Sequence, residues 1–435
     1  MRKTGTFPVE DERLLAPRSE HFEFGGPVGA FFVSTTVPFF TYAFFFYCNE
    51  EVGCALPPKS WTLPLHNMAQ GVVNGLTDTQ AWIIYLSWYT FCVAAWALIP
   101  CQEVEGTELR TGGKLLYQIN ALRTMLLALA VTAGLIITQG PASATFLYDH
   151  WVGLIGVSLI VAFTQATFVY VRSFEKGRLL AKGGNTGNHI YDWFIGRELN
   201  PRIGAFDLKY FNELRPGLIL WVLLDISAMC HQYVSLGRVT DSIVLVTGFH
   251  FIYVVDALYN EASILSTMDI TTDGNGWMLE VGDLTSVPSV YSLQARIVAF
   301  SPVDLGLFAS AAIVALNALG YWIFRSSNST KHNFRQGKNL DKVKYMTTSS
   351  GRKLITSGWW GMCRHPNYLG DLLMGLAWSL PCGFSHPLAY TYPAYFLVLL
   401  VHRQMRDDEA CKEKYGKDWD KYCSLVPSRI FPGIY

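Results

Sequence analysis

Residues 253–284 read YVVDALYNEASILSTMDITTDGNGWMLEVGDL. This stretch begins inside one apolar run, residues 241–258, and ends where another, residues 284–300, begins. It contains no Lys or Arg, yet it carries six carboxylates: Asp256, Glu261, Asp269, Asp273, Glu280 and Asp283. Ionisable groups at membrane depth cost about 2.5–3.5 kcal/mol each on insertion scales, so they usually face a protein interior or a wet cavity. The pattern therefore predicts a functional site inside a membrane protein.

The composition supports an integral membrane protein. Of the 435 residues, 51% are apolar and 16% are charged, and the formal net charge is zero. This balance argues against a nucleic-acid-binding protein. The nine cysteines are scattered and form no C-x-x-C motif, so neither a disulfide framework nor a structural metal site is expected. A single bridge between Cys48 and Cys54 is left open.

Apolar segments long enough to span a bilayer recur along the chain. Eight such segments and two shorter ones lie at 28–47, 81–100, 124–138, 152–171, 217–235, 241–258, 284–300, 303–324, 370–385 and 387–401. Basic residues alternate between many and few in the intervening loops, as the positive-inside rule requires. We therefore expect an all-α integral membrane protein of about ten transmembrane helices. Residues 1–27 would form a cytosolic tail, residues 28–435 one membrane domain, and both termini would be cytosolic.

The segment 259–283 is the exception, because this topology places it on the cytosolic side although it has no basic residue. Its glycines, Gly274, Gly276 and Gly282, favour irregular backbone that lines a cavity, which is tolerated at membrane depth. An ordinary acidic loop is the alternative.

A second group of polar residues lies near the C-terminus. Residues 357–384 read SGWWGMCRHPNYLGDLLMGLAWSLPCGF, and Arg403, Arg406 and Lys414 follow. Guanidinium groups pair with phosphate oxygens and aromatic rings stack on planar ligands, so this mixture suits a nucleotide-like cofactor. Lys331 and Arg335 share a face if their segment is helical, and together they could clamp a ribose 2′-phosphate. Juxtamembrane Lys and Arg that merely face anionic lipid are the alternative.

Several motifs are missing. No G-x-G-x-x-G lies between a strand and a helix, which argues against a Rossmann cofactor domain. The ten histidines form no H-x-x-x-H or H-x-x-H-H box, so a membrane di-iron enzyme would lack its ligands. We expect no metal site.

The chain resembles the sterol reductase family. The resemblance rests on FEFGGPVGA at 22–30, LYNEASILSTMDITTDG at 258–274, GDLTSVPSVYSLQAR at 282–296, GWWGMCRHPNYLGDLL at 358–373 and KDWDKYC at 417–423. The family includes sterol C-14, delta-7 and delta-24(28) reductases and the C-terminal half of the lamin B receptor, and TMDITTDG at 267–274 favours the C-14 branch. Asn275, Ser286 and Ser289 depart from the family pattern, which usually has Phe at 275 and aromatic residues near the two serines.

The resemblance implies reduction of a sterol 14,15 double bond with NADPH in the endoplasmic reticulum membrane, or in the inner membrane of a bacterium. It places the cofactor in the C-terminal half, about residues 303–435. The implied NADPH contacts are Lys331, Arg335, Ile355, Trp360, His365, Asn367, Tyr368, Arg403, Asp407 and Tyr415. The implied catalytic residues are Tyr253, Asp256, Glu261, Asp269, Asp273 and Asp407. The implied partners are a sterol and the lipid bilayer, with no nucleic acid.

The expected chemistry explains the acidic stretch. Reducing an unactivated alkene without a flavin needs a proton to form a tertiary cation and then a hydride. An acid must stay protonated near neutral pH, and negative groups must stand near the cation. The carboxylates offer both, and Tyr253, one helical turn before Asp256, could relay the proton. Each carboxylate could instead cap a helix or satisfy a buried donor.

Three other functions stay open at this point. One is delta-7 or another sterol double-bond reduction. The second is methyl transfer from S-adenosylmethionine, because RHPNYLG at 364–370 also resembles the isoprenylcysteine carboxyl methyltransferases, although those are much shorter. The third is a non-catalytic sterol-binding or nuclear-envelope protein.

Overall fold

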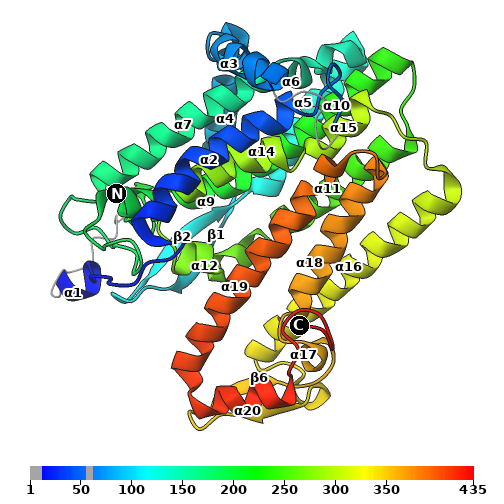
Figure 1. Ribbon diagram of the computed structural model, residues 1–435. Coiled ribbons are helices and arrows are strands. Elements are labelled where there is room, and N and C mark those ends of the chain that lie inside the picture. The colour runs from blue at the N-terminus through cyan, green and yellow to red at the C-terminus, as the bar shows by residue number, and fades with distance from the viewer. Residues whose placement is uncertain (1–11, 55–61) are drawn as a thin grey trace. The chain divides into compact units, whose positions relative to one another are not determined.

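The computed structural model describes residues 12–54 and 62–435, and the chain is mostly helical, as expected (Figure 1). It divides into two compact units. The first contains residues 1–239 and 250–302, and the second contains residues 240–249 and 303–435. The expected cofactor-binding part, 303–435, thus lies in the second unit, and the long helix α11 (Asp241–Tyr259) contributes to both.

The first unit begins with a series of helices. They are α1 (Glu12–Leu15), α2 (Gly26–Phe46), α3 (Thr62–Leu76), α4 (Thr79–Leu98), α5 (Ala121–Gln139), η1 (Pro141–Ala144), α6 (Phe146–Asp149), α7 (Trp151–Arg172), α8 (His189–Ile195), α9 (Leu208–Asn212), the π-helical turn η2 (Glu213–Gly217) and α10 (Leu218–Leu236). Helix α7 packs against α3 and α4, and α10 packs against η1 and α6. Both α7 and α10 are apolar on most faces, which is typical of helices surrounded by protein or lipid.

After α11 the first unit continues as short helical pieces. They are η3 (Glu261–Ser266), α12 (Met268–Thr271), α13 (Trp277–Val281), the π-helical turn η4 (Gly282–Ser286), α14 (Val287–Val290) and α15 (Leu293–Phe300). The expected continuous helix at 284–300 is therefore broken. Pro288 lacks a backbone N–H, and the π turn before it shifts the hydrogen-bond register, so the helix cannot run on unbroken.

The second unit is built on α16 (Gly306–Arg335), which packs against α18 (Pro366–Ser379). Its other helices are η5 (Leu340–Lys342), α17 (Trp359–Met362), η6 (Leu380–Cys382), η7 (Pro387–Tyr390), α19 (Thr391–Tyr415) and α20 (Lys417–Leu425). Helix α19 packs against both α18 and α20. Gly320 on α16 and Gly370 on α18 permit this packing, because a Cβ at Gly370 would lie 2.6 Å from the Gly320 carbonyl oxygen.

Three antiparallel hairpins, which were not predicted from the sequence, accompany the helices in the described part of the chain. They are β1 (Gln102–Glu108) with β2 (Lys114–Ile119), β3 (Arg202–Ile203) with β4 (Phe206–Asp207), and β5 (Tyr345–Thr347) with β6 (Lys353–Ile355). Their turns contain glycines with positive φ: Gly112, Gly113, Gly204 and Gly351. Such glycines favour tight hairpin turns.

Within residues 12–54 and 62–435, seven helical segments are long and apolar enough to cross a membrane. They are Gly26–Phe46, Thr79–Leu98, Ala121–Gln139, Trp151–Arg172, Leu208–Leu236, Asp241–Tyr259 and Gly306–Arg335. These match seven of the ten expected spans. The other three correspond to the broken series α13–α15, to α18 with 14 residues, and to α19, whose second half is charged. A multi-pass membrane protein is confirmed, whereas the count of ten stays a prediction.

Glycines within the acidic stretch and on the segment packed against it allow close backbone contacts. A Cβ on Gly274 would lie 1.9 Å from the carbonyl oxygen of Gly196, and a Cβ on Gly217 would lie 2.0 Å from that of Asp283. No other residue fits at such distances, because real Cβ atoms do not approach an oxygen below about 3.0 Å. The irregular backbone predicted at 259–283 therefore packs against the loop before α9 and against η2.

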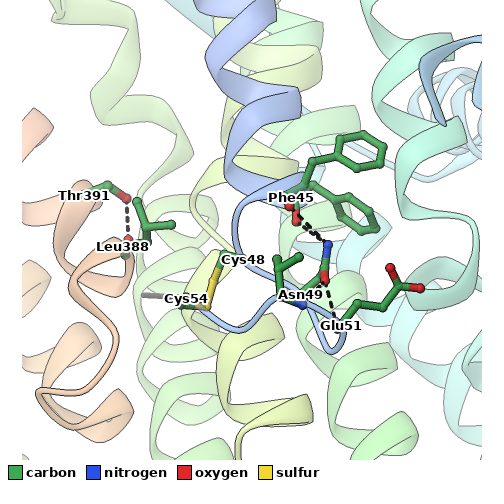
Figure 2. Close-up of a disulfide and its surroundings, with 9 residues drawn as sticks. Phe45, Cys48, Asn49, Glu51, Cys54, Leu388 and Thr391 are labelled. Carbon is green, nitrogen blue, oxygen red and sulfur yellow. Dashed lines mark hydrogen bonds between the residues drawn. A yellow bond between two sulfur atoms is a disulfide. The ribbon is translucent and has the colours of Figure 1, made fainter. Parts of the chain in front are cut away.

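The bridge that the sequence left open is present. Cys48 and Cys54 form a disulfide across a short turn that follows α2. Figure 2 shows how Asn49 organises this turn: its side-chain oxygen accepts the Glu51 backbone N–H at 3.0 Å, and its amide donates to the Phe45 carbonyl at 3.3 Å. In the described part of the chain, the other seven cysteines form no disulfide.

Candidate active site

The acidic stretch obtains its cations from a distant part of the chain. Arg215 on η2 donates from Nη2 to Oε1 of Glu261 at 2.9 Å, and both side chains are fully buried. Lys209 on α9 is also fully buried and donates to the Asp273 carbonyl oxygen at 2.7 Å. The stretch has no Lys or Arg of its own, so Lys209 and Arg215 supply the positive charges that balance its carboxylates in the folded protein.

Glu261 is held by three donors. Besides Arg215, the Tyr210 hydroxyl donates to Oε1 at 2.6 Å and the Ala121 backbone N–H donates to Oε2 at 2.8 Å. The last contact satisfies one of the free N–H groups at the start of α5. Any catalytic role of Glu261 must therefore operate through an already complete hydrogen-bond network.

Glu280 is the centre of a second buried network. Asn275 donates to its Oε1 and Asn212 to its Oε2, both at 2.7 Å. Tyr89 in turn donates to the Asn212 side-chain oxygen at 2.9 Å. Asn275 is one of the departures from the family pattern. The structure gives a reason for it, because a Phe at this position could not donate a hydrogen bond to the Glu280 carboxylate. Glu280 is not among the catalytic residues predicted from the sequence.

The other predicted catalytic residues of this unit are partly exposed. Tyr253 and Asp256 lie one turn apart on α11, Asp269 lies on α12, and Asp273 follows it. Asp269 and Asp273 are among the carboxylates whose charge acts on Lys209. The fold thus gathers Asp269, Asp273 and Lys209, while Tyr253 packs near Trp221, with 6.1 Å between ring centroids.

Ser289, another departure, borders a small internal cavity. Tyr85 and Trp151 also line this cavity, whose volume is about 10 Å³. That is about the space that one water molecule needs. A serine at position 289, near which the family usually has an aromatic residue, thus leaves space for one water molecule but not for another aromatic ring.

In the second unit, five of the predicted cofactor residues lie on two helices, α16 and α19. On each helix they form a stripe, meaning a row of side chains along one face. Lys331 and Arg335 lie four residues apart at the C-terminal end of α16, so the condition for their sharing a face is met. Arg403, Asp407 and Tyr415 recur at multiples of four residues along α19 and form the other stripe. The negative charge of Asp407 interacts electrostatically with the Lys331 ammonium group.

Trp360 joins the first stripe to the hairpin β5–β6. The Lys331 ammonium lies 4.8 Å from the Trp360 ring centroid, within cation–π range. The indole N–H donates to the Ser327 carbonyl oxygen at 3.0 Å. Ile355 at the end of β6 packs with Trp360 and Phe334 in one buried cluster. Lys331, Ile355 and Trp360 are therefore neighbours, as a shared ligand would require.

His365 and Asn367 flank the start of α18. Burial, with added repulsion from Lys331 and Arg364, lowers the pKa of His365 to about 3, so its ring is neutral. Its Nδ1 atom lies 4.0 Å from Asp407 Oδ2, but a neutral ring does not form an ion pair with the carboxylate. The His365 ring also stacks on the Tyr368 ring, with 4.8 Å between the centroids. The side-chain oxygen of Asn367 is buried and has no partner among the described residues. A buried acceptor of this kind is a candidate ligand contact.

Arg364 belongs to the framework rather than to the site. It donates to Asp408 at 2.7 Å and to the Pro427 carbonyl oxygen at 3.2 Å. The Trp419 indole N–H also donates to Asp408, at 3.1 Å. These contacts tie the loop before α18 to α19 and α20, and they fix the neighbouring His365 and Asn367.

Comparison with known proteins identifies the family. A family model described as the ergosterol biosynthesis ERG4/ERG24 family matches residues 18–435. The chain belongs to this family. The resemblance inferred from the sequence is thereby confirmed.

Curated relatives match along nearly their whole length. The delta(14)-sterol reductase erg24 of Schizosaccharomyces pombe is 48% identical over 419 residues, which cover 95% of this chain and 97% of that protein. The delta(14)-sterol reductase ERG24 of Candida albicans is 43% identical over 448 residues, and that of Saccharomyces cerevisiae is 41% identical over 440. Each of these two matches covers 97% of this chain and 99% of the relative.

Proposed function

We propose that this ERG4/ERG24 family member is a delta-14 sterol reductase that uses NADPH. The supporting observation is that relatives named for this activity match it at 41–48% identity over nearly the full length. The match includes both the acidic stretch at 253–284 and the polar and aromatic residues near the C-terminus. A methyltransferase of the isoprenylcysteine type would have no use for the acidic stretch. Delta-7 reduction is the nearest alternative.

The reaction follows from the structure of the alkene. C14 of the sterol is bonded to three carbons, namely C15 of the double bond and two other ring carbons, so protonation at C15 creates a tertiary cation at C14. Tyr253 would protonate C15, and Asp256, Asp269 and Asp273 would stabilise the cation by their negative charge. NADPH, when bound, supplies the hydride that completes the reduction at C14.

The second unit offers groups that fit NADPH. Lys331 and Arg335 would pair with its phosphates, and the planar rings of Trp360 and Tyr368 would pack on its bases. The buried Asn367 oxygen would accept a hydrogen bond from the cofactor. Arg403, Asp407 and Tyr415 on α19, with Ile355 and the neutral His365, would complete the lining.

In the cell we propose a multi-pass location in the endoplasmic reticulum membrane with both termini in the cytosol. The Cys48–Cys54 disulfide supports this orientation, because disulfides persist in oxidising compartments such as the reticulum lumen. The three segments α13–α15, α18 and α19 would complete a set of ten membrane-crossing elements.

Isotope labelling tests the proposal. Purified protein in detergent is given a sterol with a C14=C15 bond and NADPH deuterated at the transferable C4 position, and the product is analysed by mass spectrometry and NMR. We expect deuterium at C14 from NADPH and, in deuterated water with unlabelled NADPH, deuterium at C15. Reduction of a C7=C8 sterol instead would favour the delta-7 alternative. Binding of S-adenosylmethionine without any NADPH-dependent reduction would reject the proposal.

A further inference from the structure

A histidine and an aspartate meet in the interior of the first unit, between α10 and α11. His250 Nδ1 lies 2.8 Å from Asp225 Oδ2, and both side chains are fully buried. Both residues lie near the middle of segments that can span a membrane. Ionisable groups at that depth are costly, and those that occur usually serve a function.

Trp221 gives His250 a second neighbour. The indole Nε1 lies 3.2 Å from the same Nδ1 atom, and an indole N–H can only donate. A ring nitrogen carries either a proton or a lone pair, so only one of the two contacts is a hydrogen bond at a time. With its proton, Nδ1 donates to Asp225, and without it, Nδ1 accepts from Trp221. The surroundings of His250 thus accommodate two proton arrangements of the ring.

Trp221 also connects the pair to Tyr253. Its ring centroid lies 4.8 Å from that of His250 and 6.1 Å from that of Tyr253. His250 and Tyr253 are three residues apart on α11, and Trp221 and Asp225 are four apart on α10, so each pair shares a helix face. Tyr253 is partly exposed whereas His250 is fully buried. Tyr253 thus has an accessible side, whereas His250 and Asp225 are enclosed in the interior.

We propose that the Asp225–His250 pair restores the proton of Tyr253 after this phenol has protonated the sterol, an inference that rests on the proposed function. The Tyr253 O–H bond breaks as the C15–H bond forms, which leaves a phenolate. Protonated His250 then gives a ring proton to the phenolate oxygen, and water reprotonates His250 before the next turnover. Asp225 stays ionised, stabilises the protonated ring and fixes its orientation. Each turnover thus consumes one proton from water and one hydride from NADPH.

His250 and Asp225 are positioning residues in this scheme, because they act through Tyr253. The contrasting interpretation is that the pair only locks α10 against α11. A purely structural pair would affect the amount of folded protein and its thermal stability. It would not change the turnover number of the protein that does fold, nor the solvent isotope effect on turnover.

The test uses the substitution His250→Gln, which keeps a hydrogen-bonding side chain but removes the ring nitrogens. A matched control exists in the same unit, where His150 Nδ1 lies 2.6 Å from Asp78 Oδ2 with side chains that are 24% and 25% exposed. We expect His250→Gln to lower kcat by about 10- to 100-fold, in the lower range of general acid–base effects, with little change in the KM for sterol. The solvent deuterium isotope effect on kcat should rise, because reprotonation becomes limiting. His150→Gln should stay within about twofold of the parent.

A double-mutant cycle with Tyr253→Phe completes the test. If His250 acts through Tyr253, adding His250→Gln to Tyr253→Phe should cause no further loss of kcat. Additive losses, or an unchanged kcat in His250→Gln, would overturn the proposal. If His250→Gln does not fold, Asp225→Asn takes its place with the same expected results. A parent protein that reduces no sterol would instead reject the proposed function, so the two failures are distinguishable.

Discussion

Arg215 Nη2 lies 2.9 Å from Glu261 Oε1, and the two residues are 46 positions apart in the chain. This buried ion pair supplies a cation to an acidic stretch that has none of its own. Lys209 adds a second cation to the same region through the carbonyl oxygens of Ile270 and Asp273. The carboxylates at 256–283 are therefore part of a mixed-charge interior rather than an isolated negative patch.

Removing the Glu261 carboxylate should destabilise the protein. Glu261→Ala leaves Arg215 buried without its charge partner, which typically costs about 3–5 kcal/mol. Thermal unfolding in detergent would measure the loss, with the exposed Glu108→Gln as a control. An unchanged unfolding temperature in Glu261→Ala would show that the pair contributes nothing to stability.

Arg335→Ala should impair the use of NADPH more than the use of NADH. A phosphate contact is made equally in the ground and transition states, so its loss should raise the KM for NADPH and leave that for sterol nearly unchanged. NADH lacks the 2′-phosphate, and its use should suffer less. Lys338→Ala, an exposed residue beyond α16, is the control. Equal losses with both cofactors would reject the assignment of Arg335 to the 2′-phosphate.

Local patterns predicted much of this molecule. The apolar runs gave the seven spanning helices, and the four-residue spacing of Lys331 and Arg335 correctly placed them on one helix face. The ion pair of Arg215 with Glu261 could not be predicted, because the two residues are 46 positions apart and no local pattern indicates that their segments are in contact. His250 went unnoticed for a related reason: a lone histidine in an apolar helix shows no function until Asp225 is seen beside it. The break at 282–288 depends on a π turn, for which the sequence offers only Gly282 and Pro288.

The neutral His365 should affect stability at acid pH. Its pKa is lowered from 6.5 to about 3 by burial, so between these values the unfolded chain binds a proton that the folded protein does not. The free energy of unfolding should therefore fall as the pH drops from about 6.5 toward 3. His365→Gln should reduce the steepness of this decline, whereas the exposed His66→Gln should not. Identical pH profiles for the parent and His365→Gln would contradict the buried neutral state.

The Cys48–Cys54 disulfide should report the membrane orientation. In sealed microsomes with the cytosolic side outward, a membrane-impermeant maleimide should label the exposed Cys101, because its loop is expected in the cytosol. Cys48 and Cys54 should react only after both reduction and permeabilisation. Peptide mass spectrometry would locate the labels. Reaction of Cys48 or Cys54 in intact microsomes would place their turn on the cytosolic side and reverse the proposed topology.

The acidic stretch should determine the affinity for a cationic sterol analogue. An ammonium group at the C14 position imitates the carbocation, and transition-state analogues bind at least about 10²-fold tighter than substrates. Asp256→Asn and Asp269→Asn each remove a negative charge without changing side-chain size, so each should weaken binding of this analogue more than binding of the neutral sterol. Glu261→Gln should also weaken it, but together with a loss of stability, because Arg215 loses its partner. The dissociation constant for NADPH should stay unchanged and serves as the internal control. If Asp256→Asn and Asp269→Asn both bind the analogue as tightly as the parent, the cation forms away from this stretch, and Asp407 becomes the counter-charge to examine.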